Sequence, residues 1–181
     1  MNDTIYETAF DSTTVDTLEA ELWRLVSERR LPVDAGSLSE VVVELADNAL
    51  LHSGEDGGWF SVQIGGRARE ELAVVVSDRG VGIPHRVNQA AADRDLDDYQ
   101  ALLLAFQPRF SSTGDPHRGF GLNIALEYTG RIPGSALTVE SGRAVFAATD
   151  AKGRVLSRGA RPVQGVTARL SVPVSSSGPV K

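Results

Sequence analysis

The sequence predicts an α/β domain in which helices cover one face of a sheet. Two segments near the N-terminus, residues 12–30 and 37–53, carry apolar side chains at helical spacing. Residues 72–77 form a near-continuous apolar run, which is typical of a strand buried on both sides. Residues 166–172 alternate apolar and polar side chains, the pattern of a strand with one face in the core. Such a strand suits a sheet that helices cover on one side.

The two long helices have recognisable start signals. Ser12 or Thr13 is expected to cap the first helix. In the second, Ser37 and Glu40 have the spacing of a capping box, in which two side chains satisfy the first free amides of the helix. Shorter helices are predicted at residues 99–106 and 123–128.

The remaining regular segments are predicted to be strands, because turn residues separate runs of β-prone residues. In addition to residues 72–77 and 166–172, these strands are expected at residues 4–10, 59–64, 136–140, 144–149 and 154–157. A long polar segment, about residues 83–118, lies between packed elements, and such a segment is either disordered or a lid. The tail, residues 174–181, is predicted to be loose.

Composition limits the class of protein. At 181 residues the chain is predicted to form a single domain, residues 1–181, with a buried core. Its formal charge of −6 argues against a broad nucleic-acid surface. Without cysteine it has no disulfide or thiolate metal site. No apolar run reaches the length of a membrane span and no signal-peptide pattern opens the chain, so a cytoplasmic protein that does not bind membranes is expected.

One face of the second helix carries a polar stripe. Glu44, Asn48 and His52 lie four residues apart. Each step of four advances only about 40° beyond a full turn, so the three side chains share one face. The rest of the helix is largely apolar and is expected to pack inside. A polar stripe beside such a surface either faces solvent or lines a site.

Two glycine-containing segments are candidate ligand loops. Residues 78–84, Asp-Arg-Gly-Val-Gly-Ile-Pro, follow the buried strand, and their glycines allow the backbone to approach a ligand closely. The alternatives are a tight turn with a solvated Asp78, or a calcium loop, although the further spaced acidic ligands of a calcium loop are missing. Residues 118–122, Arg-Gly-Phe-Gly-Leu, lead into a helix whose free amides would form a phosphate seat.

Taken together and in this order, the motifs resemble those of the GHKL superfamily of ATPases and kinases, which includes gyrase-type ATPases, heat-shock chaperones and histidine kinases. The resemblance covers residues 37–122 and, more loosely, residues 165–173. It implies a Bergerat-type fold. That fold is a two-layer α/β (α+β) sandwich with a mixed, mostly antiparallel sheet, helices over one face of the sheet, and an ATP lid.

The resemblance also implies a role for each residue that matches a motif. Asn48 would be the protein ligand of Mg²⁺, and Glu44 the general base that acts on a water or an acceptor hydroxyl. Asp78 would accept a hydrogen bond from the adenine amino group, which disfavours guanine because guanine has a carbonyl oxygen there. The alternative for Glu44 and Asn48 is an ordinary solvated helix face. The other cofactor-binding residues implied by the resemblance are His52, Gly80, Gly82, Ile83, Arg118, Gly119, Gly121, Leu122 and Thr167.

Some features have two interpretations. His52 matches a histidine of the anti-sigma-factor kinase branch, but a hydrogen bond at the helix end would also explain it. Residues 106–110 resemble the aromatic box in the lid of sensor histidine kinases, although paired aromatic residues also pack in cores. In the closing strand Val166 occupies the position where the family usually has Thr, and Thr167 follows it. The acidic cluster Asp93–Asp98 is expected to be solvated surface.

In format the chain resembles the bacterial anti-sigma-factor serine kinases, whose Glu-Leu-x-x-Asn-Ala-x-x-His helix is very similar to residues 44–52. This implies an enzyme that uses ATP and Mg²⁺ to transfer the γ-phosphoryl group to a Ser or Thr of a partner protein. The alternatives are a nucleotide-gated module that recruits a partner without turnover, and a slow ATPase. The partner and the oligomeric state, with a homodimer as one option, stay open. Residues 140–165 contain more β structure than a minimal kinase of this type needs.

Overall fold

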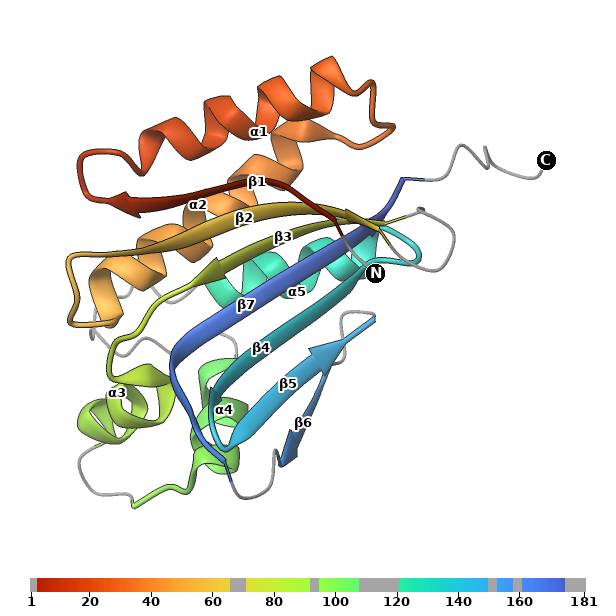
Figure 1. Ribbon diagram of the computed structural model, residues 1–181. Helices are drawn as coiled ribbons and strands as arrows, with labels where there is room; N and C mark the ends of the chain where they lie inside the picture. The colour runs from red at the N-terminus through yellow and green to blue at the C-terminus, as the bar shows by residue number, and fades with distance from the viewer. Residues whose placement is uncertain are drawn as a thin grey trace.

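The structure is a computed structural model, and it describes residues 3–65, 71–91, 95–107, 121–149, 153–157 and 161–174. Figure 1 shows its helices and strands. In chain order they are β1 (Asp3–Asp11), α1 (Asp16–Glu28), α2 (Ala35–His52), β2 (Gly57–Gly65), β3 (Glu71–Ser77), α3 (Gly82–Ala90), α4 (Asp98–Ala105), α5 (Gly121–Arg131), β4 (Ala136–Gly142), β5 (Ala144–Ala148), β6 (Arg154–Ser157) and β7 (Val163–Pro173).

The strands form one seven-stranded sheet in the order β1-β2-β3-β7-β4-β5-β6. Every described pair of neighbouring strands is antiparallel. The last strand, β7, inserts between β3 and β4 and so joins the two parts of the sheet (Figure 1). Each strand that the sequence predicts is present, with its ends shifted by a few residues. The predicted sheet of mostly antiparallel strands is confirmed.

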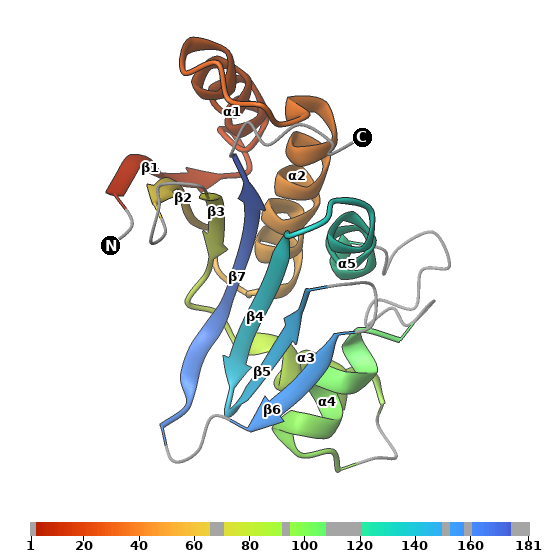
Figure 2. The same cartoon turned by 90° about the vertical axis from the view of Figure 1, so that its right-hand side faces the viewer.

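The helices lie on one side of this sheet, as the view in Figure 2 shows. Helix α2 packs against β2 and β3, α5 packs against β4, and α1 packs against α2. Fully buried side chains from both layers, among them Leu18, Leu38, Phe60, Leu137 and Leu170, form one core between them. The prediction of a two-layer sandwich is therefore confirmed. In the part of the chain that the structure describes, no helix combines the length and the apolar character needed to cross a membrane.

Strand β7 shows the predicted alternation of faces. Ala168 lies opposite Val76 on one side and Val139 on the other, and all three are buried under the helices. The neighbouring residue Arg169 points to the uncovered face, where its guanidinium pairs with Glu71 at 2.9 Å. Because side chains alternate along a strand, this register fixes which residues of β7 reach the helical layer.

Helix α2 begins two residues before the predicted cap. Asp34 is the N-cap residue, and its side chain accepts hydrogen bonds from the backbone amides of Gly36 at 3.0 Å and Ser37 at 3.4 Å. The prediction of a capping box from Ser37 is therefore wrong. The Ser37 hydroxyl instead donates to the Asp34 carboxylate at 2.7 Å. Aspartate is as good an N-cap as serine, so the local pattern alone left both starts open.

The start of α1 also differs from the prediction. The helix begins at Asp16 after Val15, and no side chain caps it. Asp11, at the end of β1, accepts hydrogen bonds from the amides of Thr13 at 2.8 Å and Thr14 at 3.0 Å. These bonds hold the turn between strand and helix, so the polar residues that looked like helix caps belong to the turn.

The segment predicted as a polar lid contains two helices that pack onto the sheet, while residues 108–118 of the predicted lid lie outside the described residues. Asp98, from the acidic cluster predicted to be solvated, accepts a hydrogen bond from the backbone amide of Arg143 at 2.7 Å. Phe106 stacks on Phe146 of β5, with ring centroids 3.5 Å apart and planes inclined by 7°. The additional β structure of residues 140–165 thus supplies a surface that holds α4 in place.

Candidate functional site

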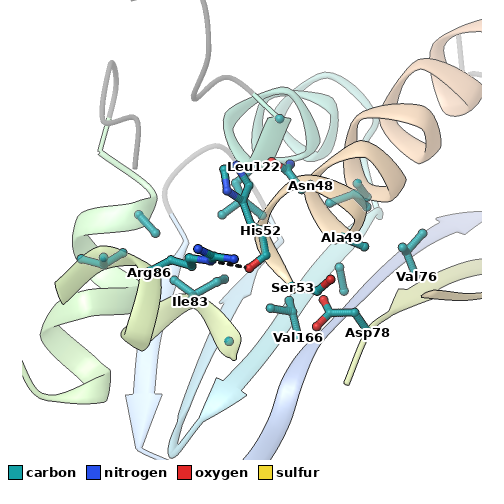
Figure 3. Close-up of a pocket in the computed structure, with 16 residues that line it drawn as sticks. Asn48, Ala49, His52, Ser53, Val76, Asp78, Ile83, Arg86, Leu122 and Val166 are labelled. Atoms are coloured by element: carbon teal, nitrogen blue, oxygen red, sulfur yellow. Dashed lines mark hydrogen bonds between the residues drawn. The ribbon is translucent and has the colours of Figure 1, made fainter. Parts of the chain in front are cut away.

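A pocket lies where α2 ends and α3 begins, with β3, β7 and the start of α5 completing its walls (Figure 3). Its empty space of about 830 Å³ includes a part that is open to solvent. Its lining is mostly apolar with a few polar groups. The lining residues are Leu45, Asn48, Ala49, His52, Ser53, Val76, Asp78, Gly82, Ile83, Arg86, Val87, Ala105, Gly121, Leu122, Val166 and Ala168.

Helix α2 provides one wall of the pocket and α5 closes directly onto it. Asn48 and His52 line the pocket one helical turn apart. At Gly121, the first residue of α5, a Cβ atom would overlap the amide nitrogen of Asn48 and would lie 3.2 Å from Oε2 of Glu44. Glu44 and Asn48 therefore meet at the start of α5. A side chain at position 121 would displace the Asn48 amide from its present position.

The Glu44 carboxyl has a pKa above its ordinary value. Burial is the largest cause, followed by repulsion from the Asp47 and Glu40 carboxylates. Taking a carboxylate out of water disfavours its charged form, and nearby like charges do the same. A carboxylate with a raised pKa holds a proton more readily, which suits it to accept one during a reaction near neutral pH.

Asp78 is a buried carboxylate with only 8% of its surface exposed. One of its oxygens accepts a hydrogen bond from the amide of Gly80 at 2.8 Å, and its backbone amide donates to the carbonyl of Val166 at 3.0 Å. Burial raises the pKa of this carboxyl, whereas hydrogen bonds from the backbone of Gly80 and Val166 lower it. The contacts fix the carboxyl group at the pocket wall, where it can accept a hydrogen bond from a ligand.

The loop after Asp78 is folded tightly between α2 and the sheet. At Gly80 a Cβ atom would overlap the backbone of Ser53 at the end of α2, so this glycine serves close packing. Gly82 has φ of +78° and lines the pocket. The next amide, that of Ile83, donates to the Ser141 hydroxyl of β4 at 2.9 Å. Glycine is therefore required at the two positions for different reasons: close packing at Gly80 and a left-handed backbone conformation at Gly82.

The sequence model of the histidine kinase-, DNA gyrase B- and HSP90-like ATPase family matches residues 33–175. The chain belongs to this family. The match includes every residue that lines the pocket, and only β1 and α1 lie before it. A comparison with curated proteins finds no match. As a member of this ATPase family, the chain is an ATP-binding domain of the ATPase and kinase type.

The structure brings together seven residues that the sequence singled out for an ATPase site of this family. They all line the one pocket, although they come from α2, α3, α5 and the loop after β3. These residues are Asn48, His52, Asp78, Gly82, Ile83, Gly121 and Leu122. Gly80 lies behind them against Ser53. Arg118 and Gly119 lie outside the described residues.

Thr167 needs a correction, because the structure does not place it at the pocket. Its neighbours Val166 and Ala168 both line the pocket. Since alternate side chains of a strand point to opposite faces, the Thr167 side chain projects to the uncovered face of the sheet. It lies in register with Ser77 of β3 and Glu140 of β4.

Sequence reasoning missed Arg86, which lines the pocket from α3. Arg86 lies in the segment predicted to be a polar lid, and a lid prediction assigns no position to individual side chains. A signal was present, because Ile83, Arg86 and Val87 have the i, i+3, i+4 spacing of one helix face. All three line the pocket in the structure.

The fit of the site to a magnesium ion rests on Asn48. Its Nδ2 atom is buried and has no hydrogen-bond partner among the described residues. A buried donor without a partner is unfavourable by about 1–3 kcal/mol, so this N–H group suits an acceptor such as a phosphate oxygen, while the amide oxygen of the same side chain is the atom that could ligate Mg²⁺. In the described ranges no three His, Asp or Glu side chains gather as a metal cluster. This donor set fits Mg²⁺ held mainly by phosphate oxygens and water.

Proposed function

We propose that the pocket binds Mg²⁺-ATP and that the protein transfers the γ-phosphoryl group to a Ser or Thr hydroxyl of a partner protein. The observation that carries the proposal is the arrangement along α2. Glu44 and Asn48 meet Gly121 at one end, and the Asp78 loop is anchored at Ser53. Asn48 and Ser53 are separated by about 7.5 Å of helix rise. A nucleotide therefore has separate places for its phosphates and its base.

In this proposal the adenine base of the nucleotide lies beside Asp78. Its buried carboxylate would accept a hydrogen bond from the exocyclic amino group of adenine. Guanine presents a carbonyl oxygen at that position, and two acceptors facing each other in a buried site repel and leave both unpaired. The wall behind the base is apolar, with Val76 and Ala168 from the sheet. These contacts support a preference for ATP over GTP.

In this proposal the phosphates of the nucleotide lie beside Asn48 and the start of α5. The first amides of a helix have no partner within it and lie at the positive end of its dipole, so they favour anions. Gly121 and Leu122 supply such amides at the pocket wall. Asn48 would contribute its amide oxygen to Mg²⁺, whose charge offsets that of the phosphates during transfer.

The proposed chemistry uses Glu44. The acceptor hydroxyl oxygen forms a bond to the γ-phosphorus while the bond from that phosphorus to the β,γ-bridging oxygen breaks, and ADP leaves with the released electron pair. Glu44 accepts the hydroxyl proton. Its raised pKa supports this role, because the carboxylate is a stronger base than an exposed glutamate.

The test compares Glu44→Gln with a matched control. Glu40 lies one turn earlier on α2 and is exposed, so Glu40→Gln removes the same charge away from the pocket. The protein is incubated with γ-labelled ATP, Mg²⁺ and small regulatory proteins of the same organism as candidate acceptors. Glu44→Gln is expected to lower phosphotransfer by about 10²–10⁴-fold while ATP affinity stays within threefold. Glu40→Gln is expected to leave ATP affinity unchanged and to lower phosphotransfer far less than Glu44→Gln, because repulsion from Glu40 is the smallest cause of the raised pKa of Glu44.

The molecule that carries the label at the end of the reaction distinguishes a kinase from a slow ATPase and from a nucleotide-gated binding module. Acid-stable phosphoserine or phosphothreonine on a partner supports the kinase. Label found only as free phosphate would contradict it and indicate a slow ATPase. Partner binding that needs ATP but survives Glu44→Gln without any transfer of label would indicate a nucleotide-gated binding module.

A further inference from the structure

We propose that Arg86 contributes positive charge to the binding of the nucleotide's phosphates from the C-terminal end of α2, on the base side of the Asn48 and α5 groups described above. The proposal rests on the proposed ATP site. Arg86 is the only lysine or arginine among the described residues that line the pocket. It lies on α3, outside every motif that the sequence pointed to.

The guanidinium of Arg86 is held in place by the end of α2. Its Nε donates to the backbone carbonyl of His52 at 2.7 Å, as the dashed line in Figure 3 shows, and a terminal nitrogen donates to Gln89 at 3.3 Å. The last carbonyls of a helix lack partners within it and carry the negative end of its dipole, so a cation is favoured there. The arginine is therefore oriented before any ligand binds.

These contacts leave part of the guanidinium available. Arginine has five N–H donors in a planar fork, and the two hydrogen bonds to His52 and Gln89 use two of them. The residue is half-buried at the pocket wall. Two parallel donors on a rigid plane match the oxygens of a phosphate group better than a single ammonium does.

Among the residues that the structure describes, no neighbouring carboxylate neutralises the charge of Arg86. Other arginines form ion pairs, such as Arg24 with Glu21, Arg131 with Glu127 and Arg169 with Glu71. In the described part of the chain, no carboxylate oxygen is found within ion-pair distance of Arg86. A fixed cation without a counter-charge, half-buried at a pocket wall, is suited to an anionic ligand.

The experiment measures binding of adenosine, AMP, ADP and ATP to the wild-type protein and to Arg86→Gln by calorimetry, each with and without Mg²⁺. Glutamine keeps a donor for the His52 carbonyl but has no charge. The control is Arg79→Gln, which removes the same charge from an exposed residue that does not line the pocket. Thermal unfolding of each variant shows whether the fold persists.

Adenosine is expected to bind Arg86→Gln and the wild type within about twofold, whereas ATP is expected to bind the variant about tenfold more weakly. The ligand at which this difference first appears identifies the phosphate that Arg86 contacts. Equal weakening of all four ligands would overturn the proposal and leave Arg86 as a residue that only positions α2. Unchanged affinity for ATP would also overturn it. Failure of the wild type to bind ATP would instead refute the proposed ATP site.

Discussion

The two walls of the pocket are built in different ways. The α2 wall has its polar groups on a single helix, where Asn48 and His52 line the pocket, while Glu44 shares their face and lies near Gly121 outside the lining. The wall formed by α3 and α4 contributes Ile83, Arg86 and Ala105, and it is held by contacts with strands that come later in the chain. The first wall is specified locally and carries the acid and amide groups. The second depends on tertiary packing, so changes in the two should have different consequences.

The largest expected effect is on the wall formed by α3 and α4. Phe106 is 5% exposed and stacks on Phe146, so Phe106→Ala should lower the free energy of unfolding by about 3 kcal/mol, as truncation of a buried aromatic ring does. Urea denaturation measures the change. Tyr99→Ala is the control on the same helix, because Tyr99 is 44% exposed and its removal should change stability by less than about 0.5 kcal/mol. Similar losses in both variants would show that α4 is not held by this stack.

The next effect is on the α2 wall. In Gly121→Ala the new methyl group would overlap the Asn48 amide, which can move aside because it is the end of a side chain. The fold should therefore survive while the site is distorted, and ATP affinity should fall by about 2 kcal/mol, or roughly 30-fold. Gly36→Ala is the control, since the nearest atom to its Cβ would be 3.4 Å away. Calorimetry that finds equal ATP affinity in both variants would contradict the proposed role of the Asn48–Gly121 contact.

A smaller effect is expected at the base end of the pocket. Asp78→Asn keeps the shape of the side chain, but its single oxygen is needed to accept from the Gly80 amide, so its NH2 donor would face the adenine amino group and the affinities for ATP and adenosine should fall equally, by about tenfold. This contrasts with Arg86→Gln, which should affect only ligands that carry phosphate. Parallel titrations of both variants with adenosine give the comparison directly. If Asp78→Asn weakens the binding of ATP but not that of adenosine, Asp78 does not contact the base.

The sign of the pH dependence follows from the raised pKa of Asp78. The folded protein holds this proton at pH values where the unfolded chain has released it, so the stability of the free protein falls as pH rises from the ordinary carboxyl pKa through the raised one. Nucleotide binding has the opposite trend, because the ionised carboxylate accepts the adenine hydrogen bond, and affinity falls as pH falls through the raised pKa. In Asp78→Asn the contributions of this group to both trends should be absent.

The sequence predicted the α2 wall well because its information is local. A helix places residues four apart on one face whatever surrounds it. The same holds for β7, where alternation alone separated the buried Ala168 from the exposed-face Arg169. The helix starts were less predictable, since Asp34 and Ser37 are both good caps and only the hydrogen bonds distinguish them.

The α3–α4 wall was not predictable in the same way, because its residues are polar along the sequence and are held by distant partners. Asp98 is one of several similar aspartates, and only the fold brings it to the Arg143 amide. Likewise, Arg86 becomes part of the pocket because α3 packs near the end of α2, where the His52 carbonyl accepts its hydrogen bond. The spacing of Ile83, Arg86 and Val87 puts Arg86 on one face of a helix, but it does not say that this face meets the end of α2.

By itself the sequence determined the layered fold, the polar stripe of α2 and the two glycine motifs, because periodicity and backbone constraints act over a few neighbouring residues. Only the tertiary structure decided that Gly121 presses against Asn48 and that Arg86 lines the pocket. These features join residues from different elements. The close packing that brings such residues together depends on the whole core, which no short segment encodes.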